Sequence, residues 1–375
     1  MFDRPANGTE VVLVGLDFGE AGHAGSLEEI QQLAASAGLR TRALVRGRRD
    51  RPDPALFAGK GKVQEVAQAL AASGAGLAIF NHELSPVQER NLERSLGCRV
   101  VDRVSLILDI FAQRARSHEG KLQVELAQLE HLSTRLIRGW THLERQKGGI
   151  GLRGPGETQL ETDRRLLGKR VKVLREKLAR VRSQRAVQRR ARSRANLMAV
   201  SLVGYTNAGK STLFNRMTRA GVYAADQLFA TLDTTTRRVH TAAGAGIVLS
   251  DTVGFIRRLP HTLVAAFRAT LEETIHADLL LHVVDASSGD REAQIAAVNQ
   301  VLAEIGADAI PQVLVLNKID RTPIPARVER DEYGRISRIW ASAQSGQGID
   351  FIRLALEEYA AAAAAPAELK SPAAA

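Results

Sequence analysis

Residues 204–211 have the composition and spacing of a phosphate-binding loop. The stretch GYTNAGKS follows an expected buried strand and precedes an expected helix, so that Gly204, Gly209, Lys210 and Ser211 form the pattern G-x-x-x-x-G-K-S. In such a loop, backbone N–H groups wrap a β-phosphate, the lysine neutralises the β- and γ-oxygens, and the serine hydroxyl ligates Mg²⁺. The pattern predicts nucleotide binding with Mg²⁺ as cofactor.

Three more motifs follow in order, each at the end of an apolar run: DTVG, NKID and ASAQSG. The Asp320 carboxylate can accept from N1–H and the 2-amino group of guanine, whereas adenine would leave this buried charge unpaired. We expect Asn317 to steady the other edge of the base, the Lys318 stem to cover the ring, and the Ala343 N–H to meet O6. The expected ligand is GTP, and the expected contacts are Gly204, Tyr205, Thr206, Asn207, Ala208, Gly209, Lys210, Ser211, Thr212, Asp251, Thr252, Val253, Gly254, Asn317, Lys318, Asp320, Ser342 and Ala343.

The residues expected to act in GTP hydrolysis lie around the γ-phosphate. They are Lys210, Thr231 and Gly254, while Ser211, Thr231 and Asp251 are the expected Mg²⁺ ligands, Asp251 through water. Thr231 stands in the threonine-rich stretch ADQLFATLDTTTRRV, where Thr235 and Thr236 are alternatives. The residue after DTVG is Phe255, where Ras-like proteins carry a water-positioning glutamine. We therefore predict slow hydrolysis that a partner accelerates.

A second glycine-rich stretch, GGIGLRGPGE, matches the dinucleotide fingerprint G-x-G-x-x-G at Gly149, Gly151 and Gly154. No strand leads into it, and helical leucine seams flank it: Leu122, Leu126, Leu129 and Leu136 before, and Leu167, Val171, Leu174, Leu178 and Val181 after. We therefore expect an antiparallel helical hairpin of two helices of roughly 25 residues, about 40 Å long, with the glycines at its tip.

The second helix of this hairpin is strongly basic. Between residues 164 and 194, Glu176 is the single acid, and the bases are Arg164, Arg165, Lys169, Arg170, Lys172, Arg175, Lys177, Arg180, Arg182, Arg185, Arg189, Arg190, Arg192 and Arg194. This run repels itself unless an anion lies alongside, which predicts contact with nucleic-acid phosphates through Arg175, Arg182 and Arg189. Lys60 and Lys62 of GKGK open another expected helix and are either solvated or in contact with phosphate.

Alternating strands and helices up to residue 115 predict a small α/β domain with a parallel sheet. The expected domains are 1–115, the basic hairpin 116–197 with its tip at about 147–157, a P-loop GTPase domain 198–360, and a disordered alanine–proline tail 361–375. Cys98 is the single cysteine, which suits a reducing cytosol, and no apolar run approaches the roughly 20 residues of a membrane span.

The stretch GGIGLRGPGETQLETDRR, placed before a GTPase domain with FATLD and DTVGFI, resembles the HflX family of translational GTPases over residues 10–358. The resemblance implies binding to the large ribosomal subunit and its rRNA, with Gly149, Gly151, Arg153, Gly154 and Gly156 touching RNA. It also implies splitting or rescue of stalled ribosomes under stress, with hydrolysis permitting release.

We further expect a cytoplasmic monomer with no DNA partner and at most peripheral membrane association. Many family members carry a further small domain after the GTPase domain, where this chain offers one helix and the tail. The alternative function is a nucleotide-gated RNA-binding or membrane-associated regulatory switch without ribosome-splitting activity.

Overall fold

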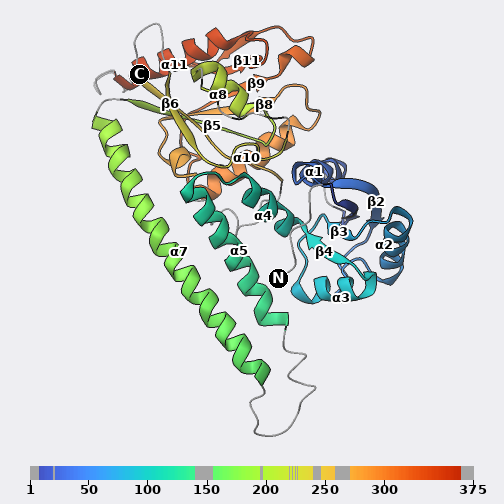
Figure 1. Cartoon of the computed structure of the whole chain (residues 1–375). Coiled ribbons are helices and arrows are strands. Elements are labelled where there is room, and N and C mark those ends of the chain that lie inside the picture. The colour runs from blue at the N-terminus through green and yellow to red at the C-terminus, as the bar shows by residue number, and fades with distance from the viewer. Residues whose placement is uncertain are drawn as a thin grey trace, which may run out of the picture. The chain divides into compact units, whose positions relative to one another are not determined.

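The computed structural model describes residues 8–19, 22–139, 155–194, 197–218, 220–221, 223, 225, 227–239, 246–257 and 271–364. These residues fall into two compact units (Figure 1). Unit 1 comprises Met1–Val181 with Pro260–Ala266, and unit 2 comprises Arg182–Leu259 with Phe267–Ala375.

Unit 1 contains a four-stranded sheet in the order β2-β1-β3-β4, in which all neighbouring strands are parallel. The strands are β1 (Glu10–Asp17), β2 (Arg40–Arg48), β3 (Leu77–Phe80) and β4 (Arg99–Asp102). The helices that connect and follow them are α1 (His23–Ser36), α2 (Lys60–Ser73), α3 (Pro86–Leu96) and α4 (Arg103–Arg114). The predicted α/β fold with a parallel sheet is therefore confirmed.

Helix starts in unit 1 follow local capping chemistry. Helix α3 begins with a capping box, because the Ser85 hydroxyl accepts from the Gln88 N–H and the Gln88 side chain accepts from the Ser85 N–H. Helix α1 begins at His23 after Gly22, whose φ of 81° is in the left-handed region. Ser26 is buried within this helix.

The two helices of the predicted hairpin are α5 (His118–Gly139) and α7 (Pro155–Arg194). They run side by side in opposite directions (Figure 1), and their seam is a cluster of Leu122, Leu126, Leu174 and Leu178 with Leu129 and Val171 against it. Helix α7 has 40 residues and thus a length of about 60 Å, well beyond the expected 40 Å. It begins at Pro155, so Gly156 is helical, whereas Gly149, Gly151, Arg153 and Gly154 lie outside the described residues.

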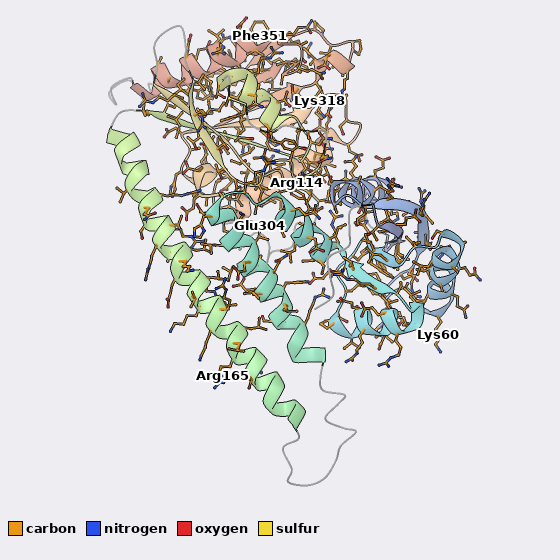
Figure 2. The ribbon with its side chains drawn as sticks, in the orientation of Figure 1. Lys60, Arg114, Arg165, Glu304, Lys318 and Phe351 are labelled. Carbon is orange, nitrogen blue, oxygen red and sulfur yellow. The ribbon has the colours of Figure 1, made fainter. Side chains whose placement is uncertain are left out.

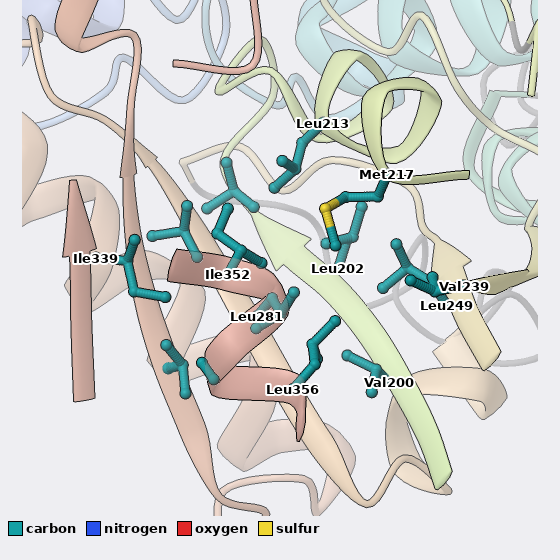
Figure 3. Close-up of a cluster of buried hydrophobic side chains, with 14 of the residues drawn as sticks. Val200, Leu202, Leu213, Met217, Val239, Leu249, Leu281, Ile339, Ile352 and Leu356 are labelled. Atoms are coloured by element: carbon teal, nitrogen blue, oxygen red, sulfur yellow. The ribbon is translucent and has the colours of Figure 1, made fainter. Parts of the chain in front are cut away.

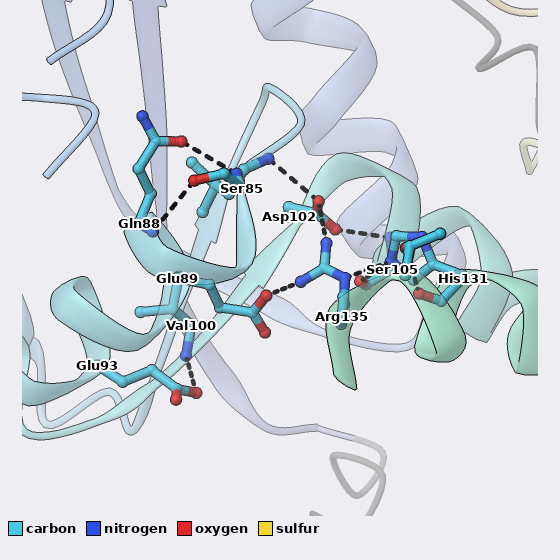
Figure 4. A network of polar contacts seen from close by, with 11 residues as sticks. Ser85, Gln88, Glu89, Glu93, Val100, Asp102, Ser105, His131 and Arg135 are labelled. Carbon is cyan, nitrogen blue, oxygen red and sulfur yellow. Dashed lines mark hydrogen bonds and ion pairs between the residues drawn. The ribbon is translucent and has the colours of Figure 1, made fainter. Parts of the chain in front are cut away.

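A buried ion-pair network fixes helix α5 to the sheet of unit 1 (Figure 4). The Asp102 carboxylate, fully buried at the end of β4, accepts from the Ser105 N–H at 2.8 Å and from Arg135 Nη2 at 2.6 Å. The guanidinium of Arg135, on α5, also pairs with Glu89 of α3. The hairpin therefore begins from a rigid base within unit 1.

Unit 2 is built on a seven-stranded sheet in the order β10-β11-β9-β8-β5-β7-β6. The strands are β5 (Met198–Gly204), β6 (Thr235–Val239), β7 (Ile247–Asp251), β8 (Leu279–Asp285), β9 (Gln312–Asn317), β10 (Arg327–Arg330) and β11 (Ile336–Trp340). The pairs β6–β7 and β10–β11 are antiparallel, and the other pairs are parallel. The helices are α8 (Lys210–Thr218), α10 (Arg291–Ile305), the 3-10 turn η1 (Ile319–Arg321) and α11 (Ile349–Ala364).

Apolar side chains from the strands of unit 2 pack against α8 and α11. Figure 3 shows Val200 and Leu202 of β5 in one cluster with Leu213 of α8 and with Ile352 and Leu356 of α11. Burial of these side chains holds the ends of β5, β7 and β9 in register. In the part of the chain that the structure describes, no helix is both long and apolar enough to cross a membrane.

Candidate GTP site and basic helix

The turn between β5 and α8 requires glycine at its two ends. Gly204 has a φ of 149°, and a Cβ atom there would lie 2.2 Å from the carbonyl oxygen of Val283. Gly209 has a φ of 92°, and its Cβ would lie 2.3 Å from the Asn317 side chain. The chain can therefore turn sharply around a phosphate only with these residue types.

Lys210, the first residue of α8, has a buried ammonium group. Its Nζ donates to the carbonyl oxygens of Gly204 at 3.1 Å and Tyr205 at 2.8 Å. Burial lowers the pKa of Lys210 to about 8, and nearby Asp251 opposes this shift. The ammonium is thus charged at neutral pH and stands within the loop that the sequence predicts to bind phosphate.

Three oxygen-bearing side chains, those of Ser211, Asp251 and Thr231, meet beside Lys210. The Ser211 hydroxyl donates to Asp251 Oδ2 at 2.7 Å, and it lies 2.6 Å from Thr231 Oγ1. Burial raises the pKa of Asp251, and its Oδ1 is buried without a hydrogen-bond partner among the described residues. Hard oxygen ligands around an unpaired buried carboxylate oxygen fit a Mg²⁺ ion.

The structure also separates the three candidate threonines. Thr235 and Thr236 belong to strand β6, and the Thr236 hydroxyl lies 3.0 Å from the Ser250 hydroxyl. Thr231 alone among the three hydrogen-bonds to Ser211 in the described structure.

The residues expected to recognise the base are hydrogen-bonded to neighbouring residues of the site. Asn317 Nδ2 donates to the Ala208 carbonyl at 2.9 Å, and Asn317 Oδ1 accepts from the Ala343 N–H at 2.9 Å. The Ala343 N–H is thus engaged by Asn317, so its expected contact with guanine O6 would have to share this bond. The Ser342 hydroxyl donates to Asp320 Oδ1, and Lys318 Nζ donates to Asp285 Oδ2 at 2.7 Å.

These motifs surround one cavity of about 430 Å³. The predicted residues that line it are Thr206, Asn207, Gly209, Lys210, Ser211, Thr212, Thr231, Thr252, Gly254, Asn317, Lys318, Asp320 and Ala343. Gly204, Tyr205, Ala208, Asp251, Val253 and Ser342 are not in the lining. Sequence reasoning missed Ala225, Gln227, Phe229, Ala230, Arg321 and Gln344, each of which lies within or next to a stretch that it had singled out.

The DTVG segment is paired directly with the phosphate loop. The Thr206 N–H donates to the Phe255 carbonyl at 2.7 Å, and the Phe255 N–H donates to the Gly204 carbonyl at 3.1 Å. The Phe255 side chain is 1% exposed. It is therefore packed into the protein and cannot hydrogen-bond to a water molecule on the phosphate.

The basic helix α7 is less self-repelling than its sequence suggests. Arg170 pairs with Glu125 at 2.6 Å, and Arg175 pairs with Glu130 at 2.8 Å, both acids being on α5. Arg182 lies 3.4 Å from Glu272. The premise that a bound anion must balance the run is therefore wrong for these positions, because acids distant in sequence neutralise part of the charge. The side chain of Arg189 lies outside the described residues.

Other basic residues of α7 remain available. Lys169, Lys172 and Arg180 are exposed and form no ion pair with any residue that the structure describes. Helical spacing places them on the face opposite Leu174 and Leu178. Arg165 lies on the same face, and Figure 2 labels it on α7 together with Lys60 at the start of α2. Lys62, by contrast, donates to the Arg46 carbonyl at 2.8 Å and pairs with Glu65.

The order of these motifs along one largely parallel sheet places the protein among the P-loop GTPases. Residues 24–112 match the family described as GTP-binding GTPase N-terminal, 114–192 the GTP-binding GTPase middle region, and 199–318 the 50S ribosome-binding GTPase. The chain is 57% identical over 373 residues to the GTPase HflX of Escherichia coli K12, covering 99% of this chain and 88% of that protein. The chain belongs to the HflX family of GTPases, which confirms the resemblance seen in its sequence.

Two further comparisons agree. The GTPase HflX of Magnetococcus marinus is 51% identical over 325 residues, covering 86% of this chain and 75% of that protein. A solved structure of SsGBP in complex with GDP aligns with a TM-score of 0.53 and 23% identity, covering 95% of this chain and 100% of that one. This second likeness concerns the fold alone.

Proposed function

We propose that this GTPase binds the large ribosomal subunit through phosphates of its rRNA and splits or rescues stalled ribosomes under stress, with GTP hydrolysis permitting release. The observation that carries the proposal is that Lys169, Lys172 and Arg180 of α7 are exposed and form no ion pair with any residue that the structure describes, in the same chain as a cavity lined by the nucleotide-binding motifs. The match of residues 199–318 to the 50S ribosome-binding GTPase family supports the choice of partner.

The chemistry of the arm favours phosphate contact over base stacking. Aromatic residues make up 4% of the chain, so there are few rings on which splayed bases could stack. The compact ammonium groups of Lys169 and Lys172 and the planar guanidinium group of Arg180 are suited to contact a phosphate backbone. In this proposal Lys60 and the tip residues Gly149, Gly151, Arg153, Gly154 and Gly156 also contact rRNA, and the protein acts in the cytoplasm as a monomer.

The GTP site assigns a role to each motif. Lys210 exchanges its two loop carbonyls for the β- and γ-phosphate oxygens, and Asp320 accepts from the guanine edge. Ser211, Thr231 and Asp251 would hold Mg²⁺, which supplies positive charge to the phosphate oxygens when bound. Because Phe255 replaces a polar residue after DTVG, hydrolysis is slow alone and faster when the ribosome orders the site.

Sucrose-gradient sedimentation tests the proposal. Full-length protein is incubated with purified 70S ribosomes and 50S subunits, with GDP, GTP or a non-hydrolysable GTP analogue. We expect the protein to migrate with 50S subunits and the 70S peak to decrease when the analogue is present. Migration with 50S subunits without loss of the 70S peak would instead indicate a binding switch. Absence of the protein from ribosomal fractions under every nucleotide would refute the proposal.

A further inference from the structure

The hydroxyl group of Thr206, in the phosphate loop, is buried without a partner. Thr206 is 5% exposed, and its Oγ1 makes no hydrogen bond within the part of the chain that the structure describes. The hydroxyl groups of Ser211 and Tyr205 in the same loop are both hydrogen-bonded, to Asp251 and to the Arg257 N–H respectively. A buried polar atom without a partner is unfavourable in a folded protein and calls for a ligand or a functional reason.

Thr206 lies among the groups that would surround the γ-phosphate. A Cβ atom placed on Gly254 would be 2.7 Å from Thr206 Cγ2, 2.8 Å from Thr206 Cα and 3.0 Å from Lys210 Nζ. The threonine side chain, the DTVG glycine and the buried ammonium therefore converge on one point. Because Oγ1 and Cγ2 occupy neighbouring staggered positions on Cβ, one rotamer change can turn the hydroxyl toward the Gly254 side.

The position after Gly254 lacks the polar side chain with which Ras-like GTPases orient the attacking water. Phe255 follows Gly254 and is packed into the protein, while its backbone is hydrogen-bonded to Gly204 and Thr206. That pairing holds the Thr206 backbone against the DTVG segment. After a change of rotamer, Thr206 can therefore present a hydroxyl from the phosphate loop on the side of the site where Phe255 offers none.

We propose that Thr206 Oγ1 orients the attacking water for GTP hydrolysis by accepting one of its hydrogen bonds. The water oxygen forms a bond to the γ-phosphorus, and the bond between that phosphorus and the β–γ bridging oxygen breaks. The electron pair leaves with GDP, and the protons of the water remain with the phosphate. The proposal deepens the GTPase activity of the site and does not depend on ribosome splitting.

The test compares Thr206→Val with Thr206→Ser in the full-length protein. Valine keeps the shape and removes the hydroxyl, whereas serine keeps the hydroxyl. Thr218→Val is the matched control, because its hydroxyl donates to the Phe214 carbonyl outside the cavity. Single-turnover GTP hydrolysis is measured with and without 50S subunits, together with Kd for GDP and for a non-hydrolysable GTP analogue and with Tm.

We expect Thr206→Val to lower the hydrolysis rate about 100- to 1000-fold, a loss typical of removing one pre-organised hydrogen-bonding group. Thr206→Ser should retain most of the rate, and Thr218→Val should keep all of it. Both Kd values should stay within about threefold, and Tm should not fall, because the removed hydroxyl has no partner.

Three results would overturn the inference. An unchanged rate in Thr206→Val would show that the hydroxyl takes no part. Weaker binding of the GTP analogue alone would place the contact on the γ-phosphate. Parallel loss of Tm and of GDP binding would show a structural role. The wild-type protein is measured in the same assay. If it hydrolyses GTP, a low rate in Thr206→Val cannot be attributed to absence of GTPase activity in the protein itself.

Discussion

Reversing the charge of Lys169, Lys172 and Arg180 to glutamate should weaken binding to the large ribosomal subunit and reduce its salt dependence. Each phosphate contact contributes about 0.9 to the slope of log K against log salt, so three lost contacts reduce the slope by about 2.7. Between 50 and 200 mM salt, a factor of about four, the wild-type affinity should then fall about 40-fold more than that of the variant. The hairpin should stay folded because these side chains are exposed and form no ion pair with described residues.

The assay is equilibrium binding of fluorescently labelled full-length protein to 50S subunits at several salt concentrations, with a non-hydrolysable GTP analogue. A matched variant with Lys169→Arg, Lys172→Arg and Arg180→Lys keeps the charge and should keep the wild-type slope. Circular dichroism verifies that helix content is preserved in both variants. Equal slopes for the glutamate variant and the wild type would refute the assignment of this face to RNA.

Three other perturbations test the GTPase unit. Asp320→Asn should lower GTP affinity on the order of 100-fold or more and shift preference toward xanthine nucleotides, since the Asp320 carboxylate no longer accepts from the guanine N1–H and 2-amino group; competition binding measures this. Gly254→Ala should slow single-turnover hydrolysis at least about tenfold, because the new Cβ would lie 2.8 Å from Thr206 Cα and 3.0 Å from Lys210 Nζ; unaltered kinetics would contradict this packing. Burial lowers the pKa of His282 to about 4 from 6.5, so the folded state resists its protonation. The contribution of His282 to stability is complete above pH 6.5 and falls by about 3 kcal/mol as pH decreases to 4, and chemical unfolding of His282→Leu should lack this part of the loss.

Local chemistry made much of the fold predictable. The strand that ends at Gly204 and the helix that begins at Lys210 follow from an apolar run and a glycine–lysine turn. The capping box at Ser85 and Gln88 likewise marks its own helix. Strand β2 is hard to recognise from sequence alone, because its arginines at positions 40, 42, 46 and 48 hide the apolar alternation of a strand.

In the helical hairpin, sequence periodicity predicted the apolar contacts but not the charge balance. Leucines at spacings of three and four residues predicted the seam that Leu122, Leu126, Leu174 and Leu178 form. The charge of the same helix was misjudged, since Glu125 and Glu130 lie on the other helix and pair with α7 across 45 residues of sequence. Charge balance depends on neighbours in space, and a linear count includes only neighbours in the chain.

The sequence by itself determined that the protein binds a guanine nucleotide, because each contact to phosphate or base needs a particular residue type at a fixed spacing within one turn. Only the tertiary structure decided which of three threonines reaches Ser211, that the Ala343 N–H is engaged by Asn317, and that Thr206 packs beside Gly254 with its hydroxyl buried and unpaired among the described residues. These facts depend on distances between strands β5, β7 and β9 and their loops. Such distances are fixed by packing of the whole sheet, which no local pattern encodes.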